Sequence, residues 1–203
     1  MQKKKEDIND KILSVARNEF IANAYKNTSM RTIAKKANVG LSNIYNYFKN
    51  KDEIFRAVLL PLLNAIEESL EKHNSSEYID INIFSSEEYQ RVHIDEYVDL
   101  ILRFREEFKL LLFKSSGSSL ENYRDEYTNK HSIMGQNYMD QMKSKYPQIN
   151  NNLSHFFIHT MSSWWLTNIG EIVSHNLSKE EIEQFISEYM AFATAGWKEL
   201  MNA

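Results

Sequence analysis

The sequence predicts an all-α protein. Only 5 Gly and 2 Pro occur among the 203 residues, and long stretches with apolar residues at helical spacing separate these few helix breakers. Hydrophobic residues make up 42% of the chain, which is a globular composition. We expect two domains, a three-helix N-terminal domain over residues 1–50 and a larger helical domain over residues 51–203.

The N-terminal part predicts three helices. The first spans about Glu6 to Ala24, and the second covers "MRTIAKKA", for which Ser29 is a favourable N-cap. After the turn "NVG", a third, short helix is expected over Leu41–Phe48. The apolar face of the first helix comprises Ile8, Ile12, Val15, Ala16 and Phe20. That of the third helix comprises Ile44, Tyr45 and Phe48.

A long helix is expected over Lys51–His73, because Asn50 and Glu53 have the spacing of a capping box. Pro61 lies inside this helix, and a proline removes one backbone hydrogen bond and clashes with the preceding turn. We therefore predict a kink or a break at Pro61. A bend there would let the helix transmit movement between the two domains; the alternative is a plain helix boundary with no role in signalling.

The rest of the chain predicts further helices after a loop at residues 74–86. Ser-x-x-Glu capping boxes at residues 85–88 and 178–181 mark two helix starts. The expected helices run from Ser85 to about Lys114 with a bend near residues 103–105, from Leu120 to about Lys145, from about Gln148 to His175 with Pro147 in the first turn, and from Ser178 towards the C-terminus.

Composition and charge limit the function classes. The chain has 0 Cys, which excludes disulfides and cysteine nucleophiles and fits a reducing, cytoplasmic location. No secretory signal is recognisable, and no apolar run reaches the roughly 20 residues that span a bilayer. Residues 1–56 hold 12 Lys and Arg against 6 Asp and Glu, so their balance is +6 although the whole chain carries −4. A basic N-terminal part suits a polyanionic partner.

Two short helices joined by a tight turn, behind a longer supporting helix, form a helix-turn-helix arrangement. Such a unit places its second helix in the major groove of DNA. Asparagine and serine side chains bind base edges, and Lys49 and Lys51 follow as phosphate-binding charges. The alternative is a small three-helix bundle with an ordinary solvated face. The outward positions of "GLSNIYNYF" are Leu41, Ser42, Asn43, Asn46 and Tyr47.

The stretch "TSMRTIAKKANVGLSNIYNYFKNKDEIF" resembles the DNA-binding signature of TetR-family transcriptional regulators, and the resemblance covers about residues 8–56. It implies an all-helical homodimer whose N-terminal helices bind double-stranded operator DNA, usually as a repressor. The C-terminal helices would form a ligand pocket and the dimer interface. The sequence departs from the family pattern where glycine is usual at Ala24, serine at Gly40, glycine at Ser42 and an acidic residue at Thr32.

The resemblance and the side-chain chemistry together predict the DNA contacts. Base edges are expected to meet Leu41, Ser42, Asn43 and Asn46. Phosphates are expected to meet Thr28, Ser29, Arg31, Tyr45, Tyr47 and Lys51.

The C-terminal part is expected to form the dimer interface through its last two helices. The helix before the last is rich in aromatic residues, which suggests packing on more than one side. The two helices would pair with their copies across a twofold axis. The apolar stripe of the last helix comprises Ile182, Phe185, Ile186, Tyr189, Met190, Ala193 and Trp197.

We also expect a small apolar or aromatic effector, bound among the helices between Ser85 and His175. Aromatic side chains with a few hydroxyls supply large contact areas and fix the orientation of a ligand. The candidate wall residues are Phe104, Phe108, Tyr123, Tyr127, Met134, Tyr138, Phe157, Met161 and Trp164.

No cofactor, metal or catalytic site is expected. His155 and His159 lie one helical turn apart and His131 is a conceivable third ligand, but two histidines at this spacing are frequent by chance. Neither a Gly-rich phosphate loop nor a Ser/His/Asp set is recognisable. The alternative to a regulator is a small-molecule-binding or enzymatic helical protein whose basic N-terminal part is incidental.

Overall fold

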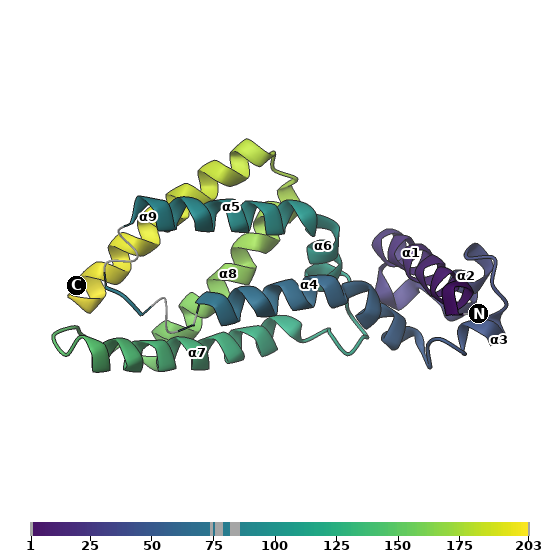
Figure 1. Cartoon of the computed structure of the whole chain (residues 1–203), viewed down its shortest axis with the longest axis horizontal. Helices are drawn as coiled ribbons and strands as arrows, with labels where there is room; N and C mark the ends of the chain where they lie inside the picture. The colour runs from purple at the N-terminus through teal and green to yellow at the C-terminus, as the bar shows by residue number, and fades with distance from the viewer. Residues whose placement is uncertain (1, 74, 76–78, 82–85, 203) are drawn as a thin grey trace. The chain divides into compact units, whose positions relative to one another are not determined.

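The computed structural model describes residues 2–73, 75, 79–81 and 86–202. Over these residues the chain is built of α-helices without a strand, which confirms the predicted all-α class (Figure 1). The helices are α1 (Gln2–Asn27), α2 (Met30–Lys36), α3 (Leu41–Ile44), α4 (Lys51–His73), α5 (Glu87–Arg103), α6 (Arg105–Phe113), α7 (Tyr123–Lys145), α8 (His155–His175) and α9 (Lys179–Met201).

The chain divides into two compact units. Unit 1 comprises Met1–Asn64 with Glu106–Tyr123, and unit 2 comprises Ala65–Arg105 with Arg124–Ala203. Unit 1 therefore holds α6 and the first part of α4 in addition to α1, α2 and α3. The functional boundary expected at residue 50 stays a prediction.

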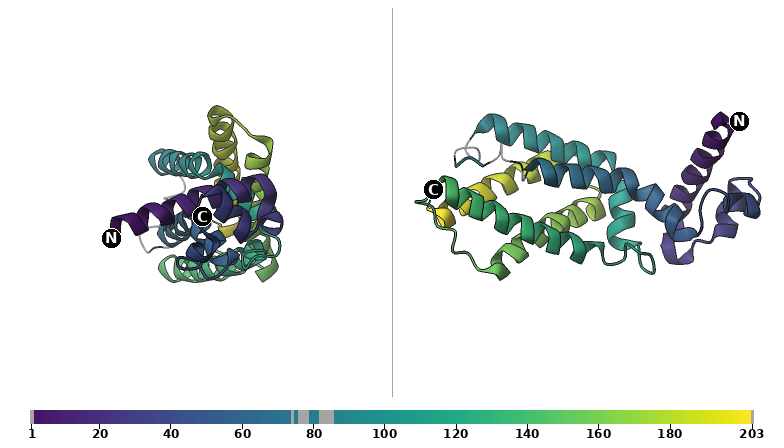
Figure 2. Two further views of the ribbon diagram at one scale, coloured as in Figure 1. Left: turned by 90° about the vertical axis from the view of Figure 1, so that its right-hand side faces the viewer. Right: turned by 60° about the horizontal axis from the view of Figure 1, so that its bottom comes forward.

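Unit 1 is built on an aromatic centre. Helix α2 packs against α1 and α3 (Figures 1 and 2). The ring of Phe55, from α4, meets those of Phe20 and Tyr25, from α1, edge to face at 5.0 and 4.9 Å between centroids. Helix α6 contacts α1 through Glu107, whose carboxylate accepts a hydrogen bond from Arg17 Nε at 2.5 Å. These contacts place the end of α1 beside the start of α4.

Unit 2 has its own core. Helix α5 packs against α9, and a second cluster of buried apolar side chains draws on α7, α8 and the C-terminal end of α9. Gly135 of α7 allows a close approach to α8, because a Cβ there would lie 3.3 Å from Ile158. The buried cluster comprises Ile79, Met139, Met142, Ile149, Ile158 and Met201.

Most predicted helix boundaries are confirmed within the described residues. Ser29 Oγ accepts from the Thr32 N–H at 3.0 Å, and Asn50 Oδ1 accepts from the Glu53 N–H at 2.8 Å. Ser178 and Glu181 form the expected capping box. The bend expected near residues 103–105 is the break between α5 and α6 at Phe104. Ser85, the predicted cap before α5, lies outside the described residues.

Three predicted helices are shorter than expected. Helix α7 begins at Tyr123 instead of Leu120. Helix α8 begins at His155 and not near Gln148, because Ser154 is its N-cap and accepts from Phe157 N–H at 3.1 Å. Asn150 instead bonds to the end of α9: its N–H donates to Met201 O at 2.7 Å and its Nδ2 to Leu200 O at 2.9 Å. Helix α3 ends at Ile44 instead of Phe48, and turns follow.

Pro61 does not break α4, which runs continuously from Lys51 to His73 and takes in this exposed proline. The break allowed for at this position is therefore wrong. Within the described residues, every helix is too short or too polar to cross a lipid bilayer.

Candidate nucleic-acid interface

The α2–α3 segment forms a tight helix-turn-helix. Asn38 takes a left-handed φ of 50°, which asparagine tolerates better than most residues. Val39 N–H closes the turn on Ala34 O at 3.0 Å, and Gly40 O accepts from the Asn43 N–H at 2.9 Å to begin α3. Because Ile44 is fully buried, α3 has a defined inner side.

The opposite side of α3 is polar and accessible. Ser42 and Asn46 are exposed, and Leu41 and Asn43 are half-buried. Asn46 Nδ2 donates to Asn43 Oδ1 at 3.1 Å, so the two amides lie side by side. The four residues predicted to meet base edges therefore share one short helix and the turn behind it.

Most of the predicted phosphate contacts flank this polar side. Ser29 and Arg31 are exposed at the start of α2, and Tyr47 is half-buried after α3. Tyr45 is 51% exposed, so the expectation that its ring packs inward is wrong. Of the three residues predicted for the apolar face over residues 41–48, only Ile44 and Phe48 are buried.

Thr28 is turned inward. Its side chain is only 4% exposed, and its hydroxyl donates to Ala24 O at 2.9 Å. A second acceptor, Glu19 O, lies 3.3 Å away. The hydroxyl of Thr28 is thus committed to the C-terminal end of α1.

Lys51 is also bound within the protein. Its Nζ donates to Tyr25 O at 2.8 Å and to Thr28 O at 2.9 Å, and lies 4.0 Å from the centroid of the Tyr25 ring. Partial burial lowers the pKa of Lys51. The sequence alone carries no signal for these contacts, because their partners precede Lys51 by more than 20 residues.

Several other cations of unit 1 are at the surface. Lys26, Lys35 and Lys49 are exposed, and none of them forms an ion pair with a described residue. Lys36, by contrast, is paired with the buried carboxylate of Glu19. The positive balance of residues 1–56 could have pointed to Lys35, which was not among the predicted contacts.

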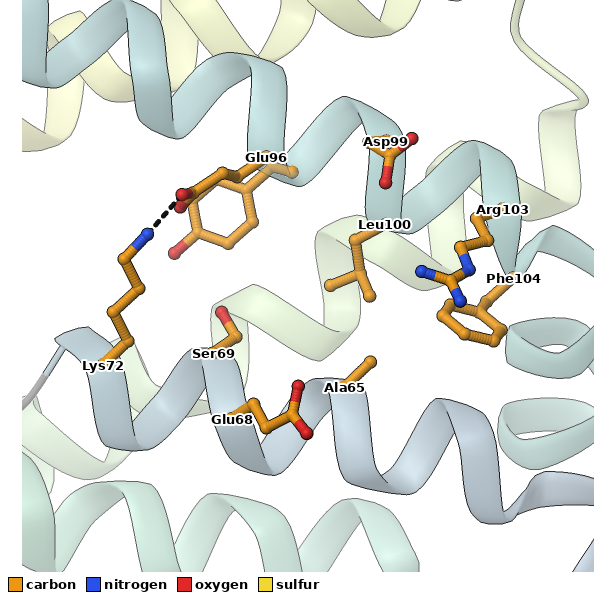
Figure 3. Close-up of a pocket in the computed structure, with 10 residues that line it drawn as sticks. Ala65, Glu68, Ser69, Lys72, Glu96, Asp99, Leu100, Arg103 and Phe104 are labelled. Carbon is orange, nitrogen blue, oxygen red and sulfur yellow. Dashed lines mark hydrogen bonds and ion pairs between the residues drawn. The ribbon is translucent and has the colours of Figure 1, made fainter.

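Unit 2 contains a cavity of about 240 Å³ between α4 and α5 (Figure 3). Lys72 and Glu96 form an ion pair at one end, and the guanidinium carbon of Arg103 lies 5.0 Å from the centroid of the Phe104 ring at the other. The lining residues are Ala65, Glu68, Ser69, Lys72, Glu96, Tyr97, Asp99, Leu100, Arg103 and Phe104.

A second cavity of about 350 Å³ lies between α7 and α8. All of its lining residues are polar or charged, which does not favour an apolar ligand. They are Arg124, Asp125, Thr128, Asn129, His159 and Ser163.

The predicted effector-wall residues are not gathered around these cavities. Phe104 lines the first, and the other eight line neither. The ring of Tyr127 stacks on Trp165 at 5.4 Å, Phe157 meets Trp197 at 5.8 Å, and Phe108 is fully buried. Met134, Tyr138 and Met161 are half-buried in unit 2, whereas Tyr123 and Phe108 belong to unit 1.

The three histidines do not form a metal-binding cluster. His155 and His159 are exposed, and His159 Nδ1 lies 3.5 Å from Ser132 Oγ. No group of three or more His, Cys, Asp or Glu within the described part of the chain is placed to hold a metal ion.

Helices α8 and α9 expose large apolar side chains. Phe156 is 78% exposed, Phe192 64%, Leu200 39% and Trp164 37%. The Trp164 and Phe192 rings stack at 6.4 Å across the two helices. Ile182 and Ile186 of the predicted dimer stripe are instead buried within the protomer.

Sequence comparison supports the helix-turn-helix assignment. Residues 12–58 match the sequence model of the bacterial regulatory proteins of the tetR family. Over 90 residues the chain is 37% identical to YhgD, an uncharacterised HTH-type transcriptional regulator of Bacillus subtilis (strain 168). That alignment covers 40% of this chain and 46% of YhgD, so the chain matches about half the length of this relative. These relatives are transcriptional regulators and not enzymes.

Solved structures share the fold. A protein of Syntrophomonas wolfei str. Goettingen assigned to the TetR family has a TM-score of 0.66 at 15% identity, with 94% of this chain and 96% of that chain covered. NalD, the secondary repressor of the MexAB-OprM multidrug efflux pump in Pseudomonas aeruginosa, has a TM-score of 0.62 at 15% identity, with 92% and 95% covered. A transcriptional regulator of Aquifex aeolicus VF5 has a TM-score of 0.61 at 17% identity, with 92% and 99% covered. Residues 12–58, which hold the helix-turn-helix, thus resemble the DNA-binding segment of the tetR family, and the chain as a whole shares the fold of these solved structures.

Proposed function

We propose that this protein is a DNA-binding transcriptional regulator that acts as a repressor. The observation that carries the proposal is the polar, accessible side of the α2–α3 segment, with two adjacent amides, one on α3 and one on the turn behind it. Such a surface suits the major groove, where amide side chains bind base edges. Repression is supported by the role of NalD, which has the same fold. Action on DNA would place the protein in the cytoplasm.

The exposed and half-buried side chains of this surface divide into two roles. Ser42, Asn43 and Asn46 are proposed to bind base edges, and Leu41 to meet a thymine methyl group. Ser29, Arg31, Tyr45 and Tyr47 are proposed to hold the phosphate backbone, because they flank that surface and carry hydroxyl or guanidinium donors.

Selection of bound sequences from a random duplex pool tests this function. The full-length protein is expected to enrich a palindromic sequence, and its affinity for that duplex should fall with a linear dependence on log salt as counterions are released. If no sequence is enriched from the pool, or if the affinity does not depend on salt concentration, the proposal is wrong. Arg31→Ala is the matched variant: it should weaken binding to every duplex without changing the enriched sequence.

We further propose that the protein is a homodimer joined through α8 and α9. The support is the exposure of four large apolar side chains on these two helices, Phe156, Trp164, Phe192 and Leu200, of which Trp164 and Phe192 stack across the two helices. A dimer would present two helix-turn-helix segments to two half-sites, as a palindromic operator requires.

Regulation by a small molecule is the third part of the proposal. An apolar or aromatic effector stays a prediction from the sequence, and the charged linings of the two cavities favour a polar one. A thermal-shift screen distinguishes these classes, since a ligand that binds the native state raises the unfolding temperature by mass action.

A further inference from the structure

Lys51 has contacts that a phosphate-binding lysine would not be expected to have. Resting on the DNA-binding function proposed above, we propose that Lys51 is a positioning residue. Its ammonium group fastens the start of α4 to the C-terminal end of α1, and this tie sets the position at which α2 begins. Lys49, two residues earlier, is the cation that meets phosphate.

The C-terminal end of α1 presents backbone carbonyls that require a hydrogen-bond donor from elsewhere in the chain. Ala24 departs from helical geometry with φ 61° and ψ 166°, so the chain turns sharply before Tyr25. The last carbonyls of a helix have no partner within it and carry partial negative charge. Tyr25 O accepts only a 3.2 Å bond from the Thr28 N–H within this turn. A cation that donates to the Tyr25 and Thr28 carbonyls satisfies both the hydrogen bonds and the charge.

The ammonium group has little capacity left for DNA. A lysine has three N–H donors, and Lys51 uses two on the carbonyls at 2.8 and 2.9 Å. Lys51 Nζ also lies 4.0 Å from the centroid of the Tyr25 ring, and this cation–π contact is a third favourable interaction. That ring is itself held in place, because it is 8% exposed and packs against Phe20 and Phe55.

The tie lies directly before the DNA-binding segment. Thr28, whose carbonyl accepts from Lys51, precedes Ser29, the N-cap of α2. A shift of the Thr28 carbonyl would therefore move the start of α2, and α3 with it. Asp52, the residue after Lys51, reinforces this corner: its Oδ1 accepts from the Ser119 N–H at 2.8 Å.

Lys49 provides the matched comparison. It is exposed and forms no ion pair with a described residue, although its own N–H donates to Glu53 Oε2 at 2.5 Å. Lys49 and Lys51 have the same side chain and lie two residues apart, but only Lys51 is turned into the protein.

The experiment uses the fact that the sequence has 0 Cys. Lys51→Cys and Lys49→Cys each place one thiol in the full chain, which is alkylated in denaturant and refolded. 2-Bromoethylamine restores an ammonium group on a side chain of lysine length, and 1-iodopropane gives a neutral group of the same size. The measurements are Tm, the affinity ratio of operator to unrelated duplex at a temperature where both adducts are folded, and the slope of log affinity against log salt.

At position 49, the neutral adduct should reduce the salt slope by about one per bound protomer, as loss of one phosphate contact does, and leave Tm and the operator preference unchanged. At position 51, the neutral adduct should lower Tm and reduce the operator preference about tenfold relative to the ammonium adduct, with an unchanged salt slope. Should the propyl adduct fail to refold, Lys51→Gln, which keeps amide donors without charge, is expected to show the same unchanged slope and a smaller loss of preference.

Several outcomes would overturn the proposal. A salt slope that falls by about one per bound protomer at position 51 would make Lys51 a phosphate contact. A lower Tm with full operator preference would make Lys51 a purely structural residue. Identical behaviour of the ammonium and propyl adducts would show that the bonds from the Lys51 ammonium group to the two carbonyls have no effect. The absence of salt-dependent binding by the wild-type protein is a separate result, seen before any variant, and would overturn the DNA-binding function together with the role of Lys51.

Discussion

At the scale of the residue, Ala24 occupies a backbone conformation that suits glycine. Its φ of 61° and ψ of 166° lie in a region that is nearly confined to glycine, and side chains there cost about 1–3 kcal/mol. This is the position where the resembling family usually has glycine. The turn is nevertheless held by tertiary contacts, among them the bond from Tyr25 N–H to Lys114 O at 3.0 Å.

Ala24→Gly is therefore expected to stabilise the protein by about 1 kcal/mol, because relief of strain exceeds the entropy that glycine adds to the unfolded chain. The measurement is the urea midpoint at a constant m-value. Ala22→Gly is the control, since this exposed residue is helical in α1 and its replacement should cost about 1 kcal/mol. Equal destabilisation by both substitutions would show that Ala24 is unstrained.

The hydrogen-bonded amides of Asn43 and Asn46 supply a second prediction for single residues. Asn43→Ala and Asn46→Ala should each cost about 1–3 kcal/mol on the selected operator and little on unrelated duplexes. Because the two amides are hydrogen-bonded at 3.1 Å, their effects should be non-additive in a double-mutant cycle. Tyr47→Ala should weaken all duplexes alike. If the asparagine variants keep full operator preference in competition binding, base recognition lies elsewhere.

At the scale of the element, α4 keeps its helical hydrogen bonding on both sides of Pro61. The helix runs from Lys51 to His73, as the sequence predicts, and its N-terminal cap is local: Asn50 Oδ1 accepts from the Glu53 N–H. The proline ring is exposed, so it contributes little to the core. Its cost is confined to the missing backbone donor and the clash with the preceding turn.

Pro61→Ala is expected to raise the free energy of unfolding by about 1–3 kcal/mol, because proline in a helix interior is about 3 kcal/mol less favourable than alanine. Tm and the urea midpoint would both report the gain. Asn64→Ala, at another exposed position of α4, should change the free energy of unfolding by less than about 0.5 kcal/mol. A loss of stability in Pro61→Ala would contradict this expectation and mean that proline favours the native state at this position.

At the scale of the whole molecule, the exposed aromatics of α8 and α9 predict the oligomeric state. The wild type is expected to sediment as a dimer at micromolar concentration, and the double variant Phe156→Ser with Phe192→Ser as a monomer. Phe113→Ser, at a 54% exposed residue of α6, is the control and should leave the dimer intact. Dimers that persist in the double variant would place the interface on other helices.

The sequence predicted those parts of the fold that depend on neighbours along the chain. Ser29, Asn50 and Ser178 cap helices as expected, because a capping side chain bonds a backbone group only two or three residues ahead. The helix-turn-helix segment was predictable for the same reason, since its caps, turn and apolar spacing lie within about 25 residues.

Other features were decided only by the tertiary structure. Asn150 is kept out of α8 by two bonds to the end of α9, about 50 residues later. Ile182 and Ile186 are buried in their own protomer, so an apolar stripe alone did not identify the side of α9 that remains exposed. Lys51 and Lys49 are alike in sequence, and only the carbonyls of Tyr25 and Thr28 distinguish them. Where a side chain points depends on partners that folding brings from distant parts of the chain, and local spacing carries no information about them.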